Sequence, residues 1–326
     1  MQASRRLFQE RQGRHFSPRK PGWSIRSILF VVLLVSCSDA AFGTENETRK
    51  PFAEWANLPH PKQFTIRLWY MEGESYHVWY GRQRQDITVH KQGEDYGIDP
   101  MQGMILLEYG LAPSWAADLN VGYGTVGTRS YNPLGNSESA SGFLDTTLGV
   151  RYQISNEAYT KSPWIPTLTF RAGAILPGNY NRDFPFAPGN RSAAIEPSFL
   201  LRKHVGWKGL GLYGDALYRW MRTSGDDQYM VSVGFFQEIK NWTLSAGYRH
   251  FQQLSGNDLT PVPVGTPIAY SPQVREISDA LEAGFQYVTP KSGYKLGFYT
   301  RKTFDGSNTD SAFLVSAFVE FPFGGK

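Results

Sequence analysis

Apolar and polar side chains alternate with a period of two along residues 143–178. In the first half of this stretch one face carries Leu144, Thr146, Leu148, Val150, Tyr152 and Ile154. The opposite face carries Asp145, Thr147, Gly149, Arg151 and Gln153. Since successive side chains of a β-strand point to opposite faces, the pattern predicts a strand over 143–154 and, after a polar turn, a second strand over 165–177.

The same alternation recurs from residue 62 to the C-terminus, in segments close to the roughly 9–11 residues that a membrane-crossing strand needs. Further strands are predicted near residues 64–70, 76–80, 105–109, 117–123, 195–202, 210–220, 229–238, 242–249, 281–287, 295–301 and 313–321, with a less regular one at 85–91. Many carry small or charged residues in mid-strand on the polar face. A water-soluble sandwich accounts for one such hairpin, but a chain built of them favours an all-β transmembrane antiparallel β-barrel with a polar lumen.

The predicted connections alternate in length. Those at 111–113, 204–208, 239–240 and 289–292 are short, and those at 125–142, 178–190, 222–227, 254–274 and 304–310 are longer or rich in turn residues. Outer-membrane barrels have short periplasmic turns and long external loops, and both termini in the periplasm require an even number of strands. We therefore expect about 12–14 strands. The count is thirteen if 75–90 is one strand, fourteen if that segment breaks, and twelve if 63–71 lies outside the wall.

Composition agrees with a barrel. The chain has 326 residues, 15% aromatic residues and 33 glycines, and no apolar run reaches the roughly 18 residues of a transmembrane helix. The net charge of +4 comes from the first 43 residues, which hold seven Lys or Arg and two acidic residues. The rest has 33 − 7 = 26 basic and 29 − 2 = 27 acidic residues. Nothing in this balance supports binding to nucleic acid, which needs a basic patch on the folded domain.

Residues 1–43 resemble a secretory signal peptide, with basic residues up to Arg26, an apolar segment and then small residues. Cleavage after Gly43 gives a mature start at Thr44. Alternatively, the sequence Leu34-Val35-Ser36-Cys37 is similar to a lipobox and would leave Cys37, the single cysteine, acylated. We expect 44–61 to be a periplasmic tail or a short plug, and 62–326 to be a barrel in the outer membrane of a Gram-negative bacterium. Its partners would then be outer-membrane lipid and the barrel-assembly machinery, which would act through the C-terminal strand.

Three motifs suggest other chemistry. The glycines at 122, 124 and 127, and at 209, 211 and 214, match GxGxxG, but they lie in alternating strands with no helix after them, so they do not predict a nucleotide site. The loop 305–310 offers oxygen ligands without the spacing of an EF-hand. His250 and Ser255 are the residue types of barrel lipases, but they are not closely set, and a nucleophile needs its base within hydrogen-bond reach. We therefore expect no catalytic residues, no cofactor and no metal ion.

Charged side chains of both signs occupy the polar parity of the strands. By that parity we expect the lumen to be lined by Arg67, Glu108, Asp118, Asp145, Arg151, Arg171, Glu196, Arg202, Asp215, Arg219, Glu238, Arg249, Glu282, Lys295 and Arg301. A charge away from bulk water must be paired or hydrated. These residues therefore form either a polar constriction that filters solutes or ion-pair networks that fill a narrow lumen.

The segments EYGLAPSWAADLNVGY (108–123), LDTTLGVRYQI (144–154) and PTLTFRAGAILPG (166–178) resemble the outer-membrane transporters of the meta-pathway phenol-degradation family, distant relatives of long-chain fatty acid channels. The resemblance implies passive uptake of small, hydrophobic or aromatic solutes and carries no catalytic residues. The alternatives from other classes are a lipid-modifying barrel hydrolase and a closed structural barrel. The particular substrate and the oligomeric state stay open.

Overall fold

The computed structural model describes residues 49–87, 89–91, 94–128, 138–160, 162–180, 191–206, 209–222, 226–258 and 274–325. The expected signal peptide and Cys37 lie outside these residues. Most of the described chain is β-strand, and the one short helix is the 3₁₀ turn η1 (Glu54–Ala56). Within the described ranges, no helix is long and apolar enough to cross a membrane.

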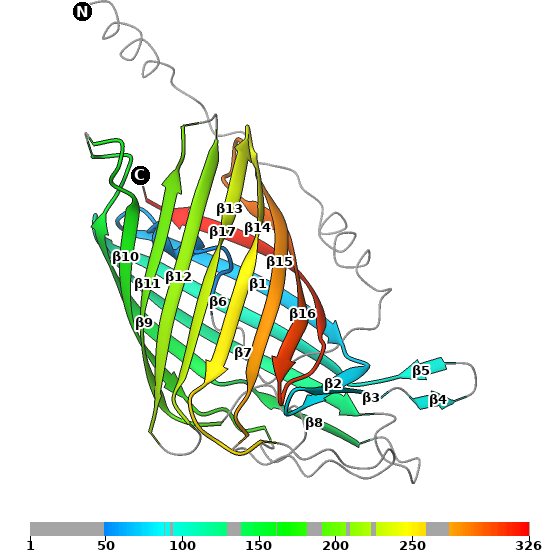
Figure 1. The fold of residues 1–326 in the computed structure, drawn as a ribbon. Helices are drawn as coiled ribbons and strands as arrows, with labels where there is room; N and C mark the ends of the chain where they lie inside the picture. The colour runs from blue at the N-terminus through cyan, green and yellow to red at the C-terminus, as the bar shows by residue number, and fades with distance from the viewer. Residues whose placement is uncertain are drawn as a thin grey trace, which may run out of the picture. The chain divides into compact units, whose positions relative to one another are not determined.

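Thirteen strands form one closed antiparallel sheet (Figure 1). They are β1 (Gln63–Glu74), β6 (Asp99–Ala112), β7 (Trp115–Thr128), β8 (Glu138–Phe143), β9 (Thr146–Ser155), β10 (Thr167–Leu176), β11 (Ala194–His204), β12 (Leu210–Met221), β13 (Gln228–Ile239), β14 (Trp242–Gln253), β15 (Ile277–Val288), β16 (Lys295–Ser307) and β17 (Phe313–Gly324). Each strand pairs with the next along the wall, and β1 pairs with both β6 and β17, which closes the ring.

The wall has twelve strand positions because β8 and β9 share one of them. β7 pairs with β8 through residues 123–128 and with β9 through residues 115–120. Leu144 and Asp145 interrupt this strand, and Asp145 there accepts hydrogen bonds from the Gly178 amide (2.8 Å) and the Tyr180 hydroxyl (3.0 Å). The prediction of an antiparallel barrel is confirmed, with a count of twelve.

The strands that make up the twelve differ from those expected, because the sequence predicted twelve only if 63–71 lay outside the wall. Residues 63–74 are a wall strand, whereas 75–98 are not. β2 (His77–Tyr80) pairs with β3 (Gln83–Asp86), and β4 (Val89–Lys91) pairs with β5 (Glu94–Tyr96), as two separate small sheets. The prediction of wall strands at 76–80 and 85–91 was therefore wrong, because alternation reports extended backbone and not the partner with which it pairs.

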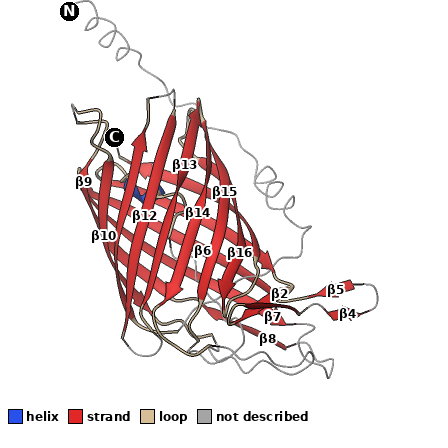
Figure 2. Ribbon diagram, in the orientation of Figure 1, coloured by secondary structure: helices blue, strands red, loops and turns tan. Residues whose placement is uncertain are grey.

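The two faces of the wall differ in chemistry. The outward face is a belt of large apolar side chains, among them Leu68, Ile105, Leu148, Val150, Phe199, Leu212, Val233, Phe235, Leu244 and Leu281, all at least 42% exposed. The inward face is largely buried and carries charged and polar side chains together with a cluster of apolar ones, including Trp69, Met104, Leu106 and Leu200. The connections at 113–114 and 240–241 join β6 to β7 and β13 to β14 at the barrel end where β1 begins and β17 ends, and Gln63 pairs there with Gly324. Figure 2 shows η1, the one helix of the described residues, inside the ring of strands.

Candidate functional site

The chain that precedes β1 enters the barrel. Residues 49–56, which we call the lumenal segment, are held by side chains of the wall. The Ala56 carbonyl accepts hydrogen bonds from Gln153 Nε2 (2.9 Å) and Thr169 Oγ1 (2.7 Å). The carbonyls of Trp55 and Phe52 accept from the guanidinium groups of Arg151 and Arg202, each at 3.3 Å. Wall residues thus replace the water that the backbone of this segment would otherwise need.

The conformation of the lumenal segment is not dictated by its own sequence. Phe52 (φ 56°) and Ala53 (φ 49°) both have left-handed backbone, and Ala53 caps η1 without a side-chain hydrogen bond. A left-handed conformation costs a non-glycine residue roughly 1–2 kcal/mol. The contacts with the wall therefore hold a backbone turn that a free peptide would avoid.

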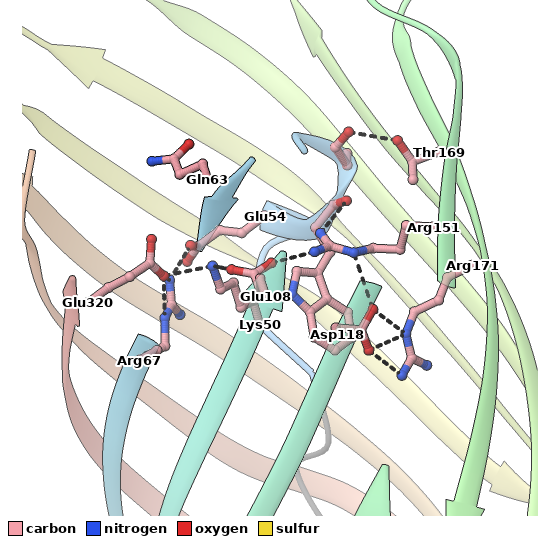
Figure 3. Close-up of polar contacts among 12 residues, drawn as sticks. Lys50, Glu54, Gln63, Arg67, Glu108, Asp118, Arg151, Thr169, Arg171 and Glu320 are labelled. Atoms are coloured by element: carbon pink, nitrogen blue, oxygen red, sulfur yellow. Dashed lines mark hydrogen bonds and ion pairs between the residues drawn. The ribbon is translucent and has the colours of Figure 1, made fainter. Parts of the chain in front are cut away.

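Charged groups of the lumenal segment and the wall form one continuous chain of ion pairs, of which Figure 3 shows the part from Glu54 to Arg171. In order it runs Glu54–Arg67 (2.6 Å), Arg67–Glu320 (2.8 Å), Glu320–Lys50 (2.6 Å), Lys50–Glu108, Glu108–Arg151 (2.6 Å), Arg151–Asp118 (3.2 Å), Asp118–Arg171 (2.8 Å), Arg171–Glu196 (2.9 Å) and Glu196–Arg219 (2.7 Å). Arg49 makes a separate pair with Asp215 at 2.7 Å. The signs alternate, so nearly every buried charge lies between opposite charges.

These ion pairs are buried. The side chains of Arg67, Arg151 and Asp118 are 0% exposed. Burial lowers the pKa of the Lys50 ammonium, although Glu108 and Glu320 act in the opposite direction. Removing a charge from water costs several kcal/mol, and only close, multiple pairing offsets that cost. The network therefore depends on the lumenal segment, which supplies Lys50 and Glu54.

Glycines on the inner wall make room for side chains that lie flat against it. A Cβ on Gly211 would overlap the Phe236 ring, and one on Gly297 would overlap the Phe318 ring. Arg202 and Arg67 lie over these two rings, each with its guanidinium carbon 3.8 Å from the ring centroid. Such stacking is a cation–π contact, which stabilises a cation that has left water.

Trp55 is the centre of the contact between the lumenal segment and the wall. It is fully buried, and the guanidinium carbons of Arg171 and Arg151 lie 4.7 and 5.1 Å from its ring. Gly149 and Gly173 leave space for Arg171, since a Cβ on Gly149 would come within 2.7 Å of its guanidinium. Because Trp55 contacts the same arginines that belong to the ion-pair chain, packing and charge hold the segment together.

The residues predicted to line the lumen fall into several groups. Arg67, Glu108, Asp118, Arg151, Arg171, Glu196 and Arg219 are in the ion-pair chain, and Lys295 joins it through Glu320 (2.8 Å). Asp215 contacts Arg49, and Arg249 contacts Glu282 (3.1 Å). Arg202 lies 3.8 Å from Glu238. Asp145 bonds to the 178–180 segment, and Arg301 is buried on β16. Glu238 and Lys295, with side chains 45% and 33% exposed, lie near the ends of their strands.

Sequence reasoning missed several members of the site: Arg49, Lys50, Glu54, Trp55 and Glu320. Glu320 could have been found, because it is the acidic residue on the inward parity of the last strand. The lumenal segment has no periodic signal. Its position depends on contacts with strands distant in sequence, such as the hydrogen bonds that join Trp55 to Arg151, 96 residues away, and Arg49 to Asp215, 166 residues away.

The alternative motifs are accounted for by packing. Gly122 and Gly124 face the side chain of Leu144, and Gly211 faces Phe236. His250 Nδ1 lies 2.7 Å from Asp279, and its Nε2 lies 3.2 Å from the Tyr229 hydroxyl, whereas Ser255 bonds to Asp226. In the described part of the chain, no three His, Cys, Asp or Glu side chains gather where they could hold a metal ion.

A closed barrel with an apolar outer belt and a charged, buried lumen defines the class of membrane-spanning β-barrels. Within that class, residues 85–320 match the family model described as "Putative MetA-pathway of phenol degradation", and the chain belongs to this family. No curated protein matches the chain in sequence.

Several solved structures are similar to this chain. An outer membrane channel from Pseudomonas putida F1 is similar with a TM-score of 0.60 and 17% identity, over 85% of this chain and 100% of that one. The translocator domain of autotransporter NalP from Neisseria meningitidis has a TM-score of 0.47 and 12% identity, over 83% of this chain and 92% of that one. The TodX monoaromatic hydrocarbon channel has a TM-score of 0.42 and 11% identity, over 83% and 92%. The first likeness supports the fold, and the other two are too distant to support more.

Proposed function

We propose that this protein is an outer-membrane channel through which small hydrophobic or aromatic solutes enter by passive diffusion. The observation that carries the proposal is the arrangement inside the barrel, where, among the described residues, only the short lumenal segment enters the ring of strands. The phenol-degradation family to which the chain belongs supports aromatic solutes as the class.

The lumenal segment packs less tightly against one side of the wall than against the other. A gap of about 10 Å³, enough for one water molecule, lies between the segment and the wall of β14–β17, bounded by Phe52, Thr243, Ser245, Gly284, Tyr299 and Phe318, among others. The ion-pair chain, by contrast, joins the segment mainly to strands on the β1–β12 side. We propose that solutes pass on the side of this gap, between aromatic rings and hydroxyl groups, when the segment shifts away from the wall.

The two other classes have less support. A Ser–His hydrolase needs its base beside its nucleophile, whereas His250 and Ser255 have other partners. Ion pairs join the charges of the wall to Lys50 and Glu54 of the lumenal segment, so we propose that the lumenal charges act mainly by holding that segment. The outer-membrane location, the signal peptide and assembly through β17 form part of the same proposal.

Single-channel conductance in a planar bilayer tests the proposal. The chain starting at Thr44 is compared with a variant in which residues 49–56 are replaced by Gly and Ser at the same length. We expect small, steady conductance for the first and clearly larger conductance for the second, because the replacement removes Lys50, Glu54 and Trp55. Absence of conductance in both, with folding shown by heat-modifiable gel mobility, would contradict a channel and favour a closed barrel.

A further inference from the structure

Phe52 occupies a slot that is built for one aromatic ring. Its ring lies against Gly284 of β15, where an added Cβ would come within 2.7 Å of the ring atom Cε2. The rings of Tyr213 and Tyr299 meet it edge-on, with centroids 5.7 and 5.5 Å away and interplanar angles of 76° and 74°. Edge-to-face contact is favoured between aromatic rings because the positive edge of one meets the negative face of another. This edge-to-face geometry favours an aromatic ring over a saturated one in the slot.

The slot borders a small gap. Phe52, Gly284 and Tyr299 line this gap of about 10 Å³ beside the lumenal segment, together with the polar side chains of Thr243, Ser245 and Gln286. The gap holds no more than one water molecule, so a solute can occupy the slot only if Phe52 leaves it. A ring that replaced Phe52 could place a small polar substituent near the hydroxyl and amide groups.

The backbone at Phe52 is strained. Phe52 and Ala53 are held at φ 56° and 49°, in the left-handed region that non-glycine residues avoid. Contacts that over-determine such a conformation are common at functional sites, where the strain is released in another state. A movement that carries the backbone of Phe52 together with its ring would release this strain, and that release would offset part of the free energy needed to displace the ring.

We infer that the slot formed by Gly284, Tyr213 and Tyr299 is a binding site for a monocyclic aromatic solute, and that Phe52 is an internal ligand that such a solute displaces. This inference rests on the proposed channel function and names the substrate class and the position of its site. A tethered ring competes at high effective concentration. Binding of the solute is therefore weak, as transport requires, because a solute held tightly would not leave.

Fluorine NMR on the refolded, full barrel tests this inference. 4-Fluorophenylalanine is placed at position 52 alone, and benzyl alcohol is titrated as the aromatic probe. We expect a saturable shift of the position-52 signal toward the frequency of a solvent-exposed ring. Cyclohexylmethanol, which has the same polar group on a saturated ring, should cause at most a small shift because it has no aromatic face for the tyrosine edges.

A label at position 236 is the matched control. Phe236 also lies on an inward glycine, Gly211, and is fully buried, but it does not line the gap beside the lumenal segment. Its signal should not respond to benzyl alcohol. The inference is overturned if the position-52 signal does not move up to the solubility limit, if the two alcohols shift it equally, or if position 236 responds in the same way.

A second variant checks the slot itself. Gly284→Ala adds a methyl group where the Phe52 ring lies, so the position-52 signal should begin near its displaced frequency and respond little to benzyl alcohol. Gly103→Ala, at a position with nothing within 4 Å of the added Cβ, should behave as the parent protein does. If benzyl alcohol displaces Phe52 but the bilayer shows no conductance, the slot stands and the channel fails. If the bilayer shows conductance but benzyl alcohol does not displace Phe52, the channel stands and the slot is not a binding site.

Discussion

Several carboxylates in the lumen each contact more than one cationic side chain. Asp118 lies 3.2 Å from Arg151 and 2.8 Å from Arg171, and Glu196 similarly contacts Arg171 and Arg219. Loss of one carboxylate would leave two buried guanidinium groups short of a counter-charge, which costs more than the pair itself contributes. At the residue scale, the loss of stability therefore depends on how many buried cations the removed carboxylate contacts.

Asp118→Asn should lower the free energy of unfolding by about 3–5 kcal/mol, the usual cost of removing one partner from a buried pair. Urea unfolding of the barrel in vesicles measures this. Glu238→Gln is the control, because Glu238 is also an inward acid but is 45% exposed and lies 3.8 Å from Arg202. Equal midpoints for the two variants would show that burial does not govern these pairs.

The effect of a methyl group added at a glycine also depends on its position in the wall. Gly211→Ala should lower the free energy of unfolding by about 1–3 kcal/mol, since the added methyl group must push the Phe236 ring away from the wall. Gly103→Ala, which faces open space on the outer wall, should have little effect. The same urea titration compares the two variants. A similar small change in both would mean that Phe236 can repack at no cost.

At the scale of elements, the segment between β1 and β6 is an arm attached to a loop. The Trp79 amide of β2 donates to the Thr309 carbonyl (2.7 Å), and the Ser311 amide donates to the His77 carbonyl (2.8 Å). Asp310 lies between these two bonds and is fully buried. Burial raises the pKa of its carboxyl to about 7, although Arg301 and Lys302 nearby act to lower it. The attachment of the arm therefore contains a titratable group near neutral pH.

This attachment should weaken as pH rises from about 4 to about 7. In that window folded Asp310 keeps a proton that the unfolded chain has lost, so the folded state loses relative stability until Asp310 ionises, and nothing further changes above pH 7. Hydrogen exchange at Trp79 and Ser311, corrected for intrinsic rates, should show about tenfold or more lower protection at pH 8 than at pH 5. Asp310→Asn should abolish the difference. If the parent protein is equally protected at both pH values, Asp310 does not titrate in this range.

At the scale of the whole molecule, the outer belt decides the environment. Val150 lies in the middle of β9 with its side chain facing outward and 42% exposed. Val150→Arg should make folding into vesicles less favourable by roughly 2–4 kcal/mol, the cost of a cation at the bilayer midplane. Tyr159→Arg, in the 156–166 turn where Tyr159 is 83% exposed, should cost close to nothing. An equal effect at both positions would contradict a belt in lipid.

The sequence by itself determined the strands, their inward and outward faces and the alternation of short and long connections, because a period of two is a local property of extended backbone. Parity placed Arg67, Arg151 and Arg171 on one face, and the structure joins them in one ion-pair chain through Glu108, Glu320, Lys50 and Asp118.

Only the tertiary structure decided which extended segments join the wall and what fills the lumen. Residues 75–98 alternate as wall strands do, yet they pair among themselves, and closure of the ring selects twelve positions. The lumenal segment has neither periodicity nor a helix cap, and its left-handed turn at Phe52 and Ala53 exists because strands distant in sequence hold it. Such contacts arise from the closed shape of the barrel, and no local pattern encodes them.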